Sequence, residues 1–362
     1  MSSRSDCLFA VLSECGADAF ICGDRPNQLY LLDHPDPSTV ISRANCTAVI
    51  FGPSETVVFP GVWISNACRD LLENCEVVAN VKGDQPPVEQ LLERLAKVGY
   101  KKIVTDSASL AEAIEKGVPA TVVELQDIGR QLRRRKDERD LAGLREAARV
   151  ADLGMSTAFA AIRPGKTCGE VIAEGTAAML RAGAESVAMA PAVGVGTYYL
   201  DSGEDPRRVI QEGDMVFIDM GIWVHGYLGD MTRAGIVGEG SAEQRDLLAT
   251  VQQAYRIGWQ AMAAGADGKL IYQSVVDHFA TKGWQQYFVH HLSHGLGLGG
   301  DRPRIAADSA DILQIGDALS CEPGVYIPGL GGARVENMIY VGEDGPEELT
   351  KSPLDLPMGL LT

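Results

Sequence analysis

The chain has 362 residues, of which 46% are apolar and 22% are charged. This length suggests two domains, and the composition is that of a globular protein, so wholesale disorder and a membrane bundle are excluded. With 32 Lys and Arg against 49 Asp and Glu, the net charge of −17 repels phosphate backbones and anionic lipid heads, which argues against nucleic-acid and membrane-surface binding.

The N-terminal residues 1–15 lack the continuous apolar stretch of a signal peptide. No later segment approaches the roughly 18 apolar residues of a membrane span. The eight cysteines contain no C-x-x-C pair and are expected to be reduced thiols. We therefore expect a cytoplasmic protein.

The first third of the chain alternates helix and strand patterns. A helix is expected over residues 2–15, and two strands, 47–51 and 56–59, flank a Gly-Pro-Ser turn that is typical of a hairpin. Further elements follow in the order helix 85–98, strand 102–105, helix 107–116 and strand 121–124. These patterns predict a small α/β domain over residues 1–130.

A charge-dense run over residues 130–140 follows. It could form an anion site, but the simpler interpretation is the exposed start of one long helix that ends at Ile162, before Pro164-Gly165. The second domain is expected to begin with this helix and to cover residues 131–362.

The second domain shows runs of helices and runs of strands. Thr167 and Glu170 have the spacing of a capping box that opens a helix to about Ala182. The remaining elements are expected as strands 186–195, 215–224 and 227–237, helices 242–264 and 269–282, and strands near 317–326 and 334–341. This order predicts an α+β domain with an antiparallel sheet.

Acidic residues inside apolar strands are the informative feature of this domain, because a buried carboxylate is costly unless it is paired or binds a metal. They are Asp219, Asp230, Glu322 and Glu336. A two-residue turn at positions 225–226 would place the first two on the same side of a hairpin. The other two share a face if the connection near residues 328–332 leaves an odd-numbered loop.

Taken singly, each acid could be an edge-strand carboxylate in water or in a salt bridge. Together they would repel one another strongly, and two divalent cations would neutralise them. His294 is the imidazole that could join them. Oxygen ligands with one imidazole suit Mn, Co, Fe or Zn.

Two motifs near His294 fail on closer inspection. His290 and His294 are four apart, but His291 stands where H-E-x-x-H needs Glu, and the glycines that follow are poor helix formers. The run from Gly295 to Gly300 matches G-x-G-x-x-G, but no βαβ unit surrounds it, so a dinucleotide site is not expected.

Five segments, 213–219, 229–233, 293–295, 322–326 and 334–336, resemble those of the pita-bread metallopeptidases, which include Xaa-Pro aminopeptidase, prolidase and creatinase. The resemblance covers residues 130 to 350. It implies an α+β fold with a curved antiparallel sheet in a pita-bread catalytic domain. The preceding α/β domain resembles the creatinase-type N-terminal domain.

The resemblance also implies roles for individual residues. Asp219 would bind one metal ion, His294 and Glu322 the other, and Asp230 and Glu336 would bridge the pair. A hydroxide between the ions would attack an amide carbonyl of a small peptide, with Glu322 moving its proton.

His290 resembles a pocket histidine of the family and is a second catalytic candidate, although a packed core histidine is an equal alternative. Tyr199, Asp301 and Arg334 are expected at the substrate. Arg334 would also anchor the strand carboxylates, with a plain salt bridge as its alternative. By resemblance, a homodimer is expected.

Two family features are missing. The peptidases usually carry a histidine shortly after the ligand histidine and another before the first ligand aspartate, but residues 300–303 and 198–208 contain none. This pattern resembles relatives that act on small metabolites, such as dimethylsulfoniopropionate lyase and ectoine hydrolase. The sequence therefore favours an Xaa-Pro peptidase-like metallohydrolase, with a non-peptidase of the same fold as the alternative and a catalytically inactive binding module as a third.

Overall fold

The computed structural model describes residues 4–33, 46–61, 69, 72, 74–78, 85–193 and 205–359. The chain divides into two compact units, Met1–Arg133 and Arg134–Thr362. None of the helices in the described part of the chain has the length and apolar character needed to cross a membrane.

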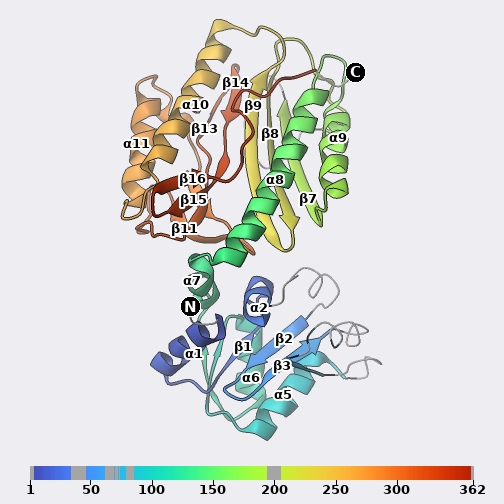
Figure 1. The fold of residues 1–362 in the computed structure, drawn as a ribbon, viewed down its shortest axis with the longest axis vertical. Helices are drawn as coiled ribbons and strands as arrows, with labels where there is room; N and C mark the ends of the chain where they lie inside the picture. Colours follow the sequence, from blue (N-terminus) through green and yellow to red (C-terminus); the bar gives the residue numbers. More distant parts are fainter. Residues whose placement is uncertain are drawn as a thin grey trace. The chain divides into compact units, whose positions relative to one another are not determined.

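The first unit is built on a mixed sheet with strand order β4-β3-β2-β1-β5-β6 (Figure 1). Its strands are β1 (Ala19–Cys22), β2 (Cys46–Phe51), β3 (Thr56–Pro60), β4 (Glu76–Val77), β5 (Lys102–Thr105) and β6 (Thr121–Glu124). Its helices are α1 (Arg4–Cys15), α2 (Arg25–Leu32), α5 (Pro87–Val98), α6 (Ala108–Gly117) and α7 (Ile128–Arg134). The expected β2–β3 hairpin is confirmed, whereas β1, β4 and α2 were not predicted.

The charged run does not form the start of one long helix. Helix α7 ends at Arg134, and three residues separate it from the start of α8 (Glu138–Ala161). Asp137 caps α8, because its carboxylate accepts from the N–H of Asp140 and the Asp140 carboxylate accepts from the N–H of Asp137. Arg133 and Lys136 are buried. The expectation of a continuous, exposed helix over 130–162 was therefore wrong.

The second unit combines helices with antiparallel sheets, as expected from the α+β pattern. Its helices are α8, α9 (Cys168–Arg181), α10 (Ala242–Ala261) and α11 (Gly268–Ala280), with a short 3₁₀ helix η1 (Gln285–Tyr287). Its strands are β7 (Ser186–Val193), β8 (Met215–Val224), β9 (Tyr227–Ile236), β10 (Ser293–Gly295), β11 (Asp301–Ile305), β12 (Ala318–Cys321), β13 (Gly324–Ile327), β14 (Gly331–Arg334), β15 (Asn337–Gly342) and β16 (Gly345–Glu348).

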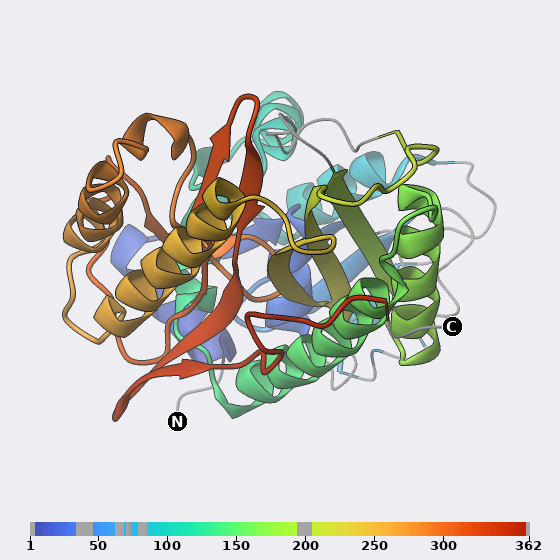
Figure 2. The same ribbon diagram turned by 90° about the horizontal axis from the view of Figure 1, so that it is seen from above.

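These strands form a β7-β8-β9 sheet, a β11-β10-β12-β15-β16 sheet and a β13-β14 pair. Helices α8 and α9 lie beside β7–β9, and α10 and α11 lie on the other side of the unit (Figures 1 and 2). The strands therefore lie between two pairs of helices, which is the architecture expected of a pita-bread domain.

Two of the expected strands are each divided in the structure. The strand expected at 317–326 breaks at Glu322 and Pro323, between β12 and β13, and the one expected at 334–341 breaks at Val335 and Glu336, between β14 and β15. Proline has no N–H to donate to a ladder, which explains the first break. Both glutamates of interest therefore lie at strand breaks and not inside strands.

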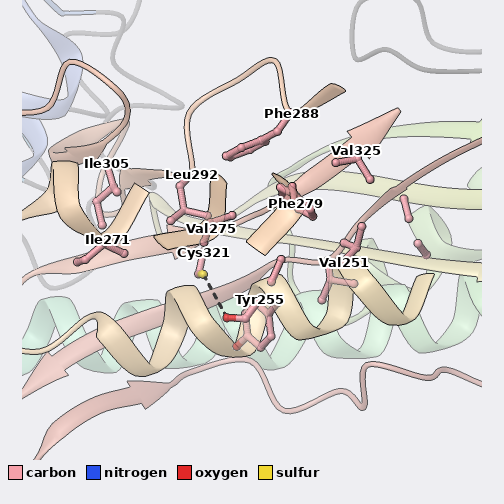
Figure 3. Close-up of a cluster of buried hydrophobic side chains, with 14 of the residues drawn as sticks. Val251, Tyr255, Ile271, Val275, Phe279, Phe288, Leu292, Ile305, Cys321 and Val325 are labelled. Atoms are coloured by element: carbon pink, nitrogen blue, oxygen red, sulfur yellow. Dashed lines mark hydrogen bonds between the residues drawn. The ribbon is translucent and has the colours of Figure 1, made fainter. Parts of the chain in front are cut away.

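A hydrophobic core packs helices α10 and α11 against strand β12. Figure 3 shows Tyr255 of α10, Val275 and Phe279 of α11 and Cys321 of β12 packed together, all of them buried. The thiol of Cys321 lies 3.9 Å from the carbonyl oxygen of Tyr255. Cys321 is thus anchored in the core immediately before Glu322.

Candidate metal centre

The β8–β9 hairpin places Asp219 and Asp230 on one face. His225 and Gly226 form its two-residue turn with φ values of 49° and 77°, the left-handed geometry that such tight hairpins require. Asp219 lies opposite Thr232, and Gly221 lies opposite Asp230. The register predicted from the turn is confirmed, and the two carboxylates project to the same side.

Glu322 and Glu336 flank the β13–β14 pair. Strand β13 ends opposite the start of β14, with Ile327 paired to Gly331, so the connection has the odd length that the shared face required. Main-chain bonding brings Glu336 to the hairpin, because its N–H donates to the carbonyl of Thr232 at 3.0 Å. Glu322 and Glu336 therefore lie next to Asp219 and Asp230.

Arg334 and Thr232 connect these carboxylates. The fully buried Arg334 donates from Nη2 to Oδ2 of Asp219 at 2.5 Å and from Nε to Oγ1 of Thr232 at 3.1 Å. The Thr232 hydroxyl lies 3.1 Å from Asp219 Oδ1 and 2.8 Å from Glu336 Oε2. One guanidinium and one hydroxyl thus hold both side chains in place.

His294, in β10, faces the same cluster. Its Nδ1 lies 3.2 Å from the carbonyl oxygen of Gly295, and since a carbonyl only accepts, Nδ1 carries the proton. Its Nε2 points to Oδ2 of Asp230 at 3.3 Å and to Oε1 of Glu322 at 3.6 Å. The ring is therefore oriented with Nε2 toward the carboxylates.

Burial and the neighbouring negative charges both raise the pKa values of two of the acids. Burial, with the charges of Asp230, Glu322 and Asp219, raises the pKa of Glu336 well above its usual range. Burial raises the pKa of Asp219 to about 6, although Arg334 opposes this. These shifts show that the acids share one poorly hydrated space.

The pKa of His294 is raised, although burial by itself would lower it. Burial alone would lower its pKa, but the hydrogen bond to Asp230 and the charges of Glu322 and Asp230 outweigh it and raise the pKa to about 9. An imidazole that is held protonated by carboxylates stands where a cation is favoured.

The donor set fits divalent metal ions. The ligand atoms of Asp230, His294 and Glu336 lie within 4.8 Å of one another, as do those of His291, His294 and Glu322. Four carboxylates around one guanidinium leave an excess of negative charge, which divalent cations would offset. Three of the five predicted ligands, Asp230, His294 and Glu336, form the first group. His294 and Glu322 belong to the second group, and Asp219 belongs to neither.

Both ring nitrogens of His290 are hydrogen-bonded, and burial and the charge of Glu322 act in opposite directions on the pKa of its ring. Its Nδ1 lies 2.7 Å from the carbonyl oxygen of His291, so that nitrogen donates, and burial lowers the pKa of the ring to about 4. The neutral Nε2 then accepts from the hydroxyl of Tyr326 at 3.0 Å, and that hydroxyl accepts from Nη1 of Arg334 at 2.6 Å. Nδ1 is thus bound to the main chain, and Nε2 is linked through Tyr326 to Arg334.

The three residues expected at the substrate, Tyr199, Asp301 and Arg334, differ in how the structure places them. Tyr199 lies outside the described residues. Arg334 is fully buried and donates to Asp219, Thr232 and Tyr326, which fits its expected role as an anchor. Its contact with a substrate stays a prediction.

Asp301 is also buried, in an ion pair. Its side chain is 0% exposed and lies 2.8 Å from Nζ of Lys136, whose side chain is 1% exposed. Gly297 permits this close packing, since a Cβ there would lie 2.2 Å from Oδ2 of Asp301. Asp301 therefore forms a buried ion pair, and its role at the substrate stays a prediction.

Sequence reasoning overlooked His291 and Thr232. Nε2 of His291 lies 3.2 Å from Oε1 of Glu322, although this histidine was used only to reject a helix motif. The two-residue turn at 225–226 pairs Thr232 with Asp219, so the contact of Thr232 with that carboxylate was within reach of the sequence.

Comparison with known proteins gives consistent matches. The model of "Metallopeptidase family M24" matches residues 142–343. An uncharacterized peptidase, YqhT, of Bacillus subtilis is 32% identical over 71% of this chain and 70% of its own. The Xaa-Pro dipeptidase of Pyrococcus horikoshii is 30% identical over 98% of this chain and 99% of its own.

Solved structures agree in fold. The Xaa-Pro dipeptidase from Bacillus anthracis superposes with a TM-score of 0.85 and 27% identity over 98% of this chain and 99% of that one. The prolidase from Pyrococcus horikoshii OT3 gives a TM-score of 0.84 at 24% identity over 98% and 100% of the two chains. At that identity the second match bears on the fold alone.

Proposed function

Because the chain belongs to metallopeptidase family M24, we propose that it is a two-metal hydrolase that cleaves Xaa-Pro dipeptides. The observation that carries this proposal is the convergence of Asp230, His294 and Glu336, whose ligand atoms lie within 4.8 Å of one another. The Xaa-Pro dipeptidases among its relatives support the substrate class.

The proposed ligands are Asp219, Asp230, His294, Glu322 and Glu336. Bound divalent ions would polarise the scissile carbonyl and lower the pKa of the attacking water. Manganese, cobalt, iron and zinc all suit these oxygen and nitrogen donors.

Glu322 is the proposed proton carrier. Burial alone would raise its pKa, but the hydrogen bond from His291 and the charges of His294 and Arg334 hold the pKa below its usual range, near 2. The group is therefore ionised at neutral pH, the state that a proton acceptor requires. Ser320 fixes its orientation, since the hydroxyl donates to Oε1 at 2.9 Å.

His290 and Arg334 act as positioning residues in this proposal. The neutral His290 ring holds the Tyr326 hydroxyl, which receives a bond from Arg334, and Arg334 in turn holds Asp219. Each member of this chain fixes the next, so the position of Asp219 depends on all of them.

Release of proline from Ala-Pro or Leu-Pro, in the presence of Mn²⁺, tests the substrate class. Proline release at a rate that chelator abolishes supports the proposal. A protein that binds metal but hydrolyses no dipeptide in a broad panel would contradict it. Such a result would favour the alternative function, action on a small metabolite. Asp301 is buried and residues 300–303 contain no histidine. The same panel should therefore include non-peptide amides.

We also propose that the chain acts as a homodimer, as the resemblance to prolidases implies. Light scattering coupled to size-exclusion chromatography tests this. A mass of twice 38.7 kDa is expected, and the mass of a single chain at working concentration would contradict it.

A further inference from the structure

His291 lies beside the metal centre without a role in the proposed ligand set. Its side chain is 34% exposed, and its Nε2 lies 3.2 Å from Oε1 of Glu322. Its ring centre is 5.6 Å from that of His294, with the two planes at 71°. Two imidazoles therefore approach one carboxylate oxygen from different directions.

The backbone fixes this arrangement on both sides. Leu292 is buried in the core and its N–H donates to the carbonyl of Ile305 at 2.8 Å. The N–H of Glu322 donates to the carbonyl of Leu292 at 2.9 Å, and Nδ1 of His290 binds the carbonyl of His291. The main chain around His291 and Glu322 is thus held by hydrogen bonds, and the His291 ring reaches Oε1 of Glu322 from this fixed backbone.

The spacing of the donor atoms matches that of ligands on one ion. Two donors that each bind an ion at about 2.1 Å lie about 3.4 Å apart in tetrahedral geometry and about 3.0 Å apart in octahedral geometry. Oε1 of Glu322 lies 3.2 Å from Nε2 of His291 and 3.6 Å from Nε2 of His294. All three ligand atoms fall within 4.8 Å of one another.

We propose that His291 is an additional ligand of the ion held by His294 and Glu322, so that this position offers two imidazole nitrogens. The inference rests on the proposed two-metal function and extends its ligand set. A second imidazole favours zinc and cobalt over manganese, because nitrogen donors suit borderline ions and oxygen donors suit hard ones. The two positions of the centre would then differ in metal preference.

The competing role for His291 is a hydrogen bond that orients Glu322. Replacement by glutamine separates the two roles, because the amide can still donate to the carboxylate but is a poor substitute for an imidazole on zinc. His278→Gln is the matched control, since that histidine lies on α11 and contacts the carbonyl of Thr250, away from the carboxylates.

The test is a titration of chelator-treated protein with zinc and with manganese, using a competing chromophoric chelator. We expect His291→Gln to weaken the affinity of the affected zinc-binding step by at least about tenfold and the manganese affinities by less than about threefold. The affinities of His278→Gln should match those of the wild type. Zinc affinities within about twofold of wild type in His291→Gln would overturn the proposal.

Cobalt-loaded protein gives a second readout that does not depend on activity. Ligating imidazoles give hyperfine-shifted proton resonances, and the proposal predicts such signals from two histidines in the wild type and from one in His291→Gln. Signals from a single histidine in both the wild type and His291→Gln would refute only the role of His291 as a ligand. Failure of the wild type to bind any divalent ion would instead refute the two-metal function itself.

Discussion

The buried guanidinium of Arg334 donates a 2.5 Å hydrogen bond to Oδ2 of Asp219. The same side chain binds the hydroxyls of Thr232 and Tyr326, so its orientation is fixed by three partners. One carboxylate of the cluster is therefore held by a cation of the chain, and the centre keeps a net negative charge for metal ions to offset.

Replacement of Arg334 by Met should destabilise the protein and impair the centre. It leaves the Asp219 carboxylate without its cation, and we expect a loss of about 2–3 kcal/mol in the free energy of unfolding. This is less than the roughly 3–5 kcal/mol of a fully buried pair, because Asp219 is 26% exposed. Arg334→Lys should recover part of this loss, since it keeps the charge but not the fork. Urea unfolding of the metal-free variants measures both, and equal stability of Arg334→Met and wild type would contradict the anchoring role.

The metal-free protein should lose stability as pH rises from 5 to 9. Burial raises the folded-state pKa of Asp219 to about 6 and that of Glu336 further, and the carboxylates raise that of His294 to about 9 despite its burial. A group with a raised folded-state pKa contributes stability at low pH and loses it as pH passes through that pKa. Urea unfolding of chelator-treated protein at pH 5, 7 and 9 tests the sign.

Metal should reverse this trend. Binding displaces the protons of these groups, so saturating Mn²⁺ should stabilise the protein more at pH 8 than at pH 5. A metal-induced shift in melting temperature that is the same at both pH values would speak against ligation by these acids.

The Lys136–Asp301 pair should behave as a structural unit. Lys136→Met alone leaves a buried carboxylate without its cation and should cost about 3–5 kcal/mol, whereas the double variant Lys136→Met/Asp301→Leu should lie closer to wild type. A double-mutant cycle from urea unfolding measures the coupling. Additive effects of the two substitutions on stability would contradict the pairing. An Asp301→Asn variant that raises KM without loss of stability would support a role of Asp301 in substrate binding.

Local rules were enough to predict part of the site. The two-residue turn at His225 and Gly226 fixes the pairing of Asp219 with Thr232, because strand side chains alternate with a period of two. The capping box at Asp137 and Asp140 was equally local. It was missed because the charged run was treated as a single helical segment.

Other parts of the site depend on contacts between distant segments. His291 meets Glu322 only because β10 pairs with β12, with Gly295 opposite Leu319. Asp301 meets Lys136 across 165 positions. No periodicity or spacing in the sequence encodes such pairings, which require the packed sheets.

The metal content of the purified protein tests the central claim most directly. After saturation with Mn²⁺ and removal of excess ion, elemental analysis should find two ions per chain in the wild type and in the exposed-carboxylate control Asp308→Asn, and a loss of both metal and activity in Asp230→Asn. A wild-type protein without bound metal, or an Asp230→Asn variant with full metal content and turnover, would contradict the account.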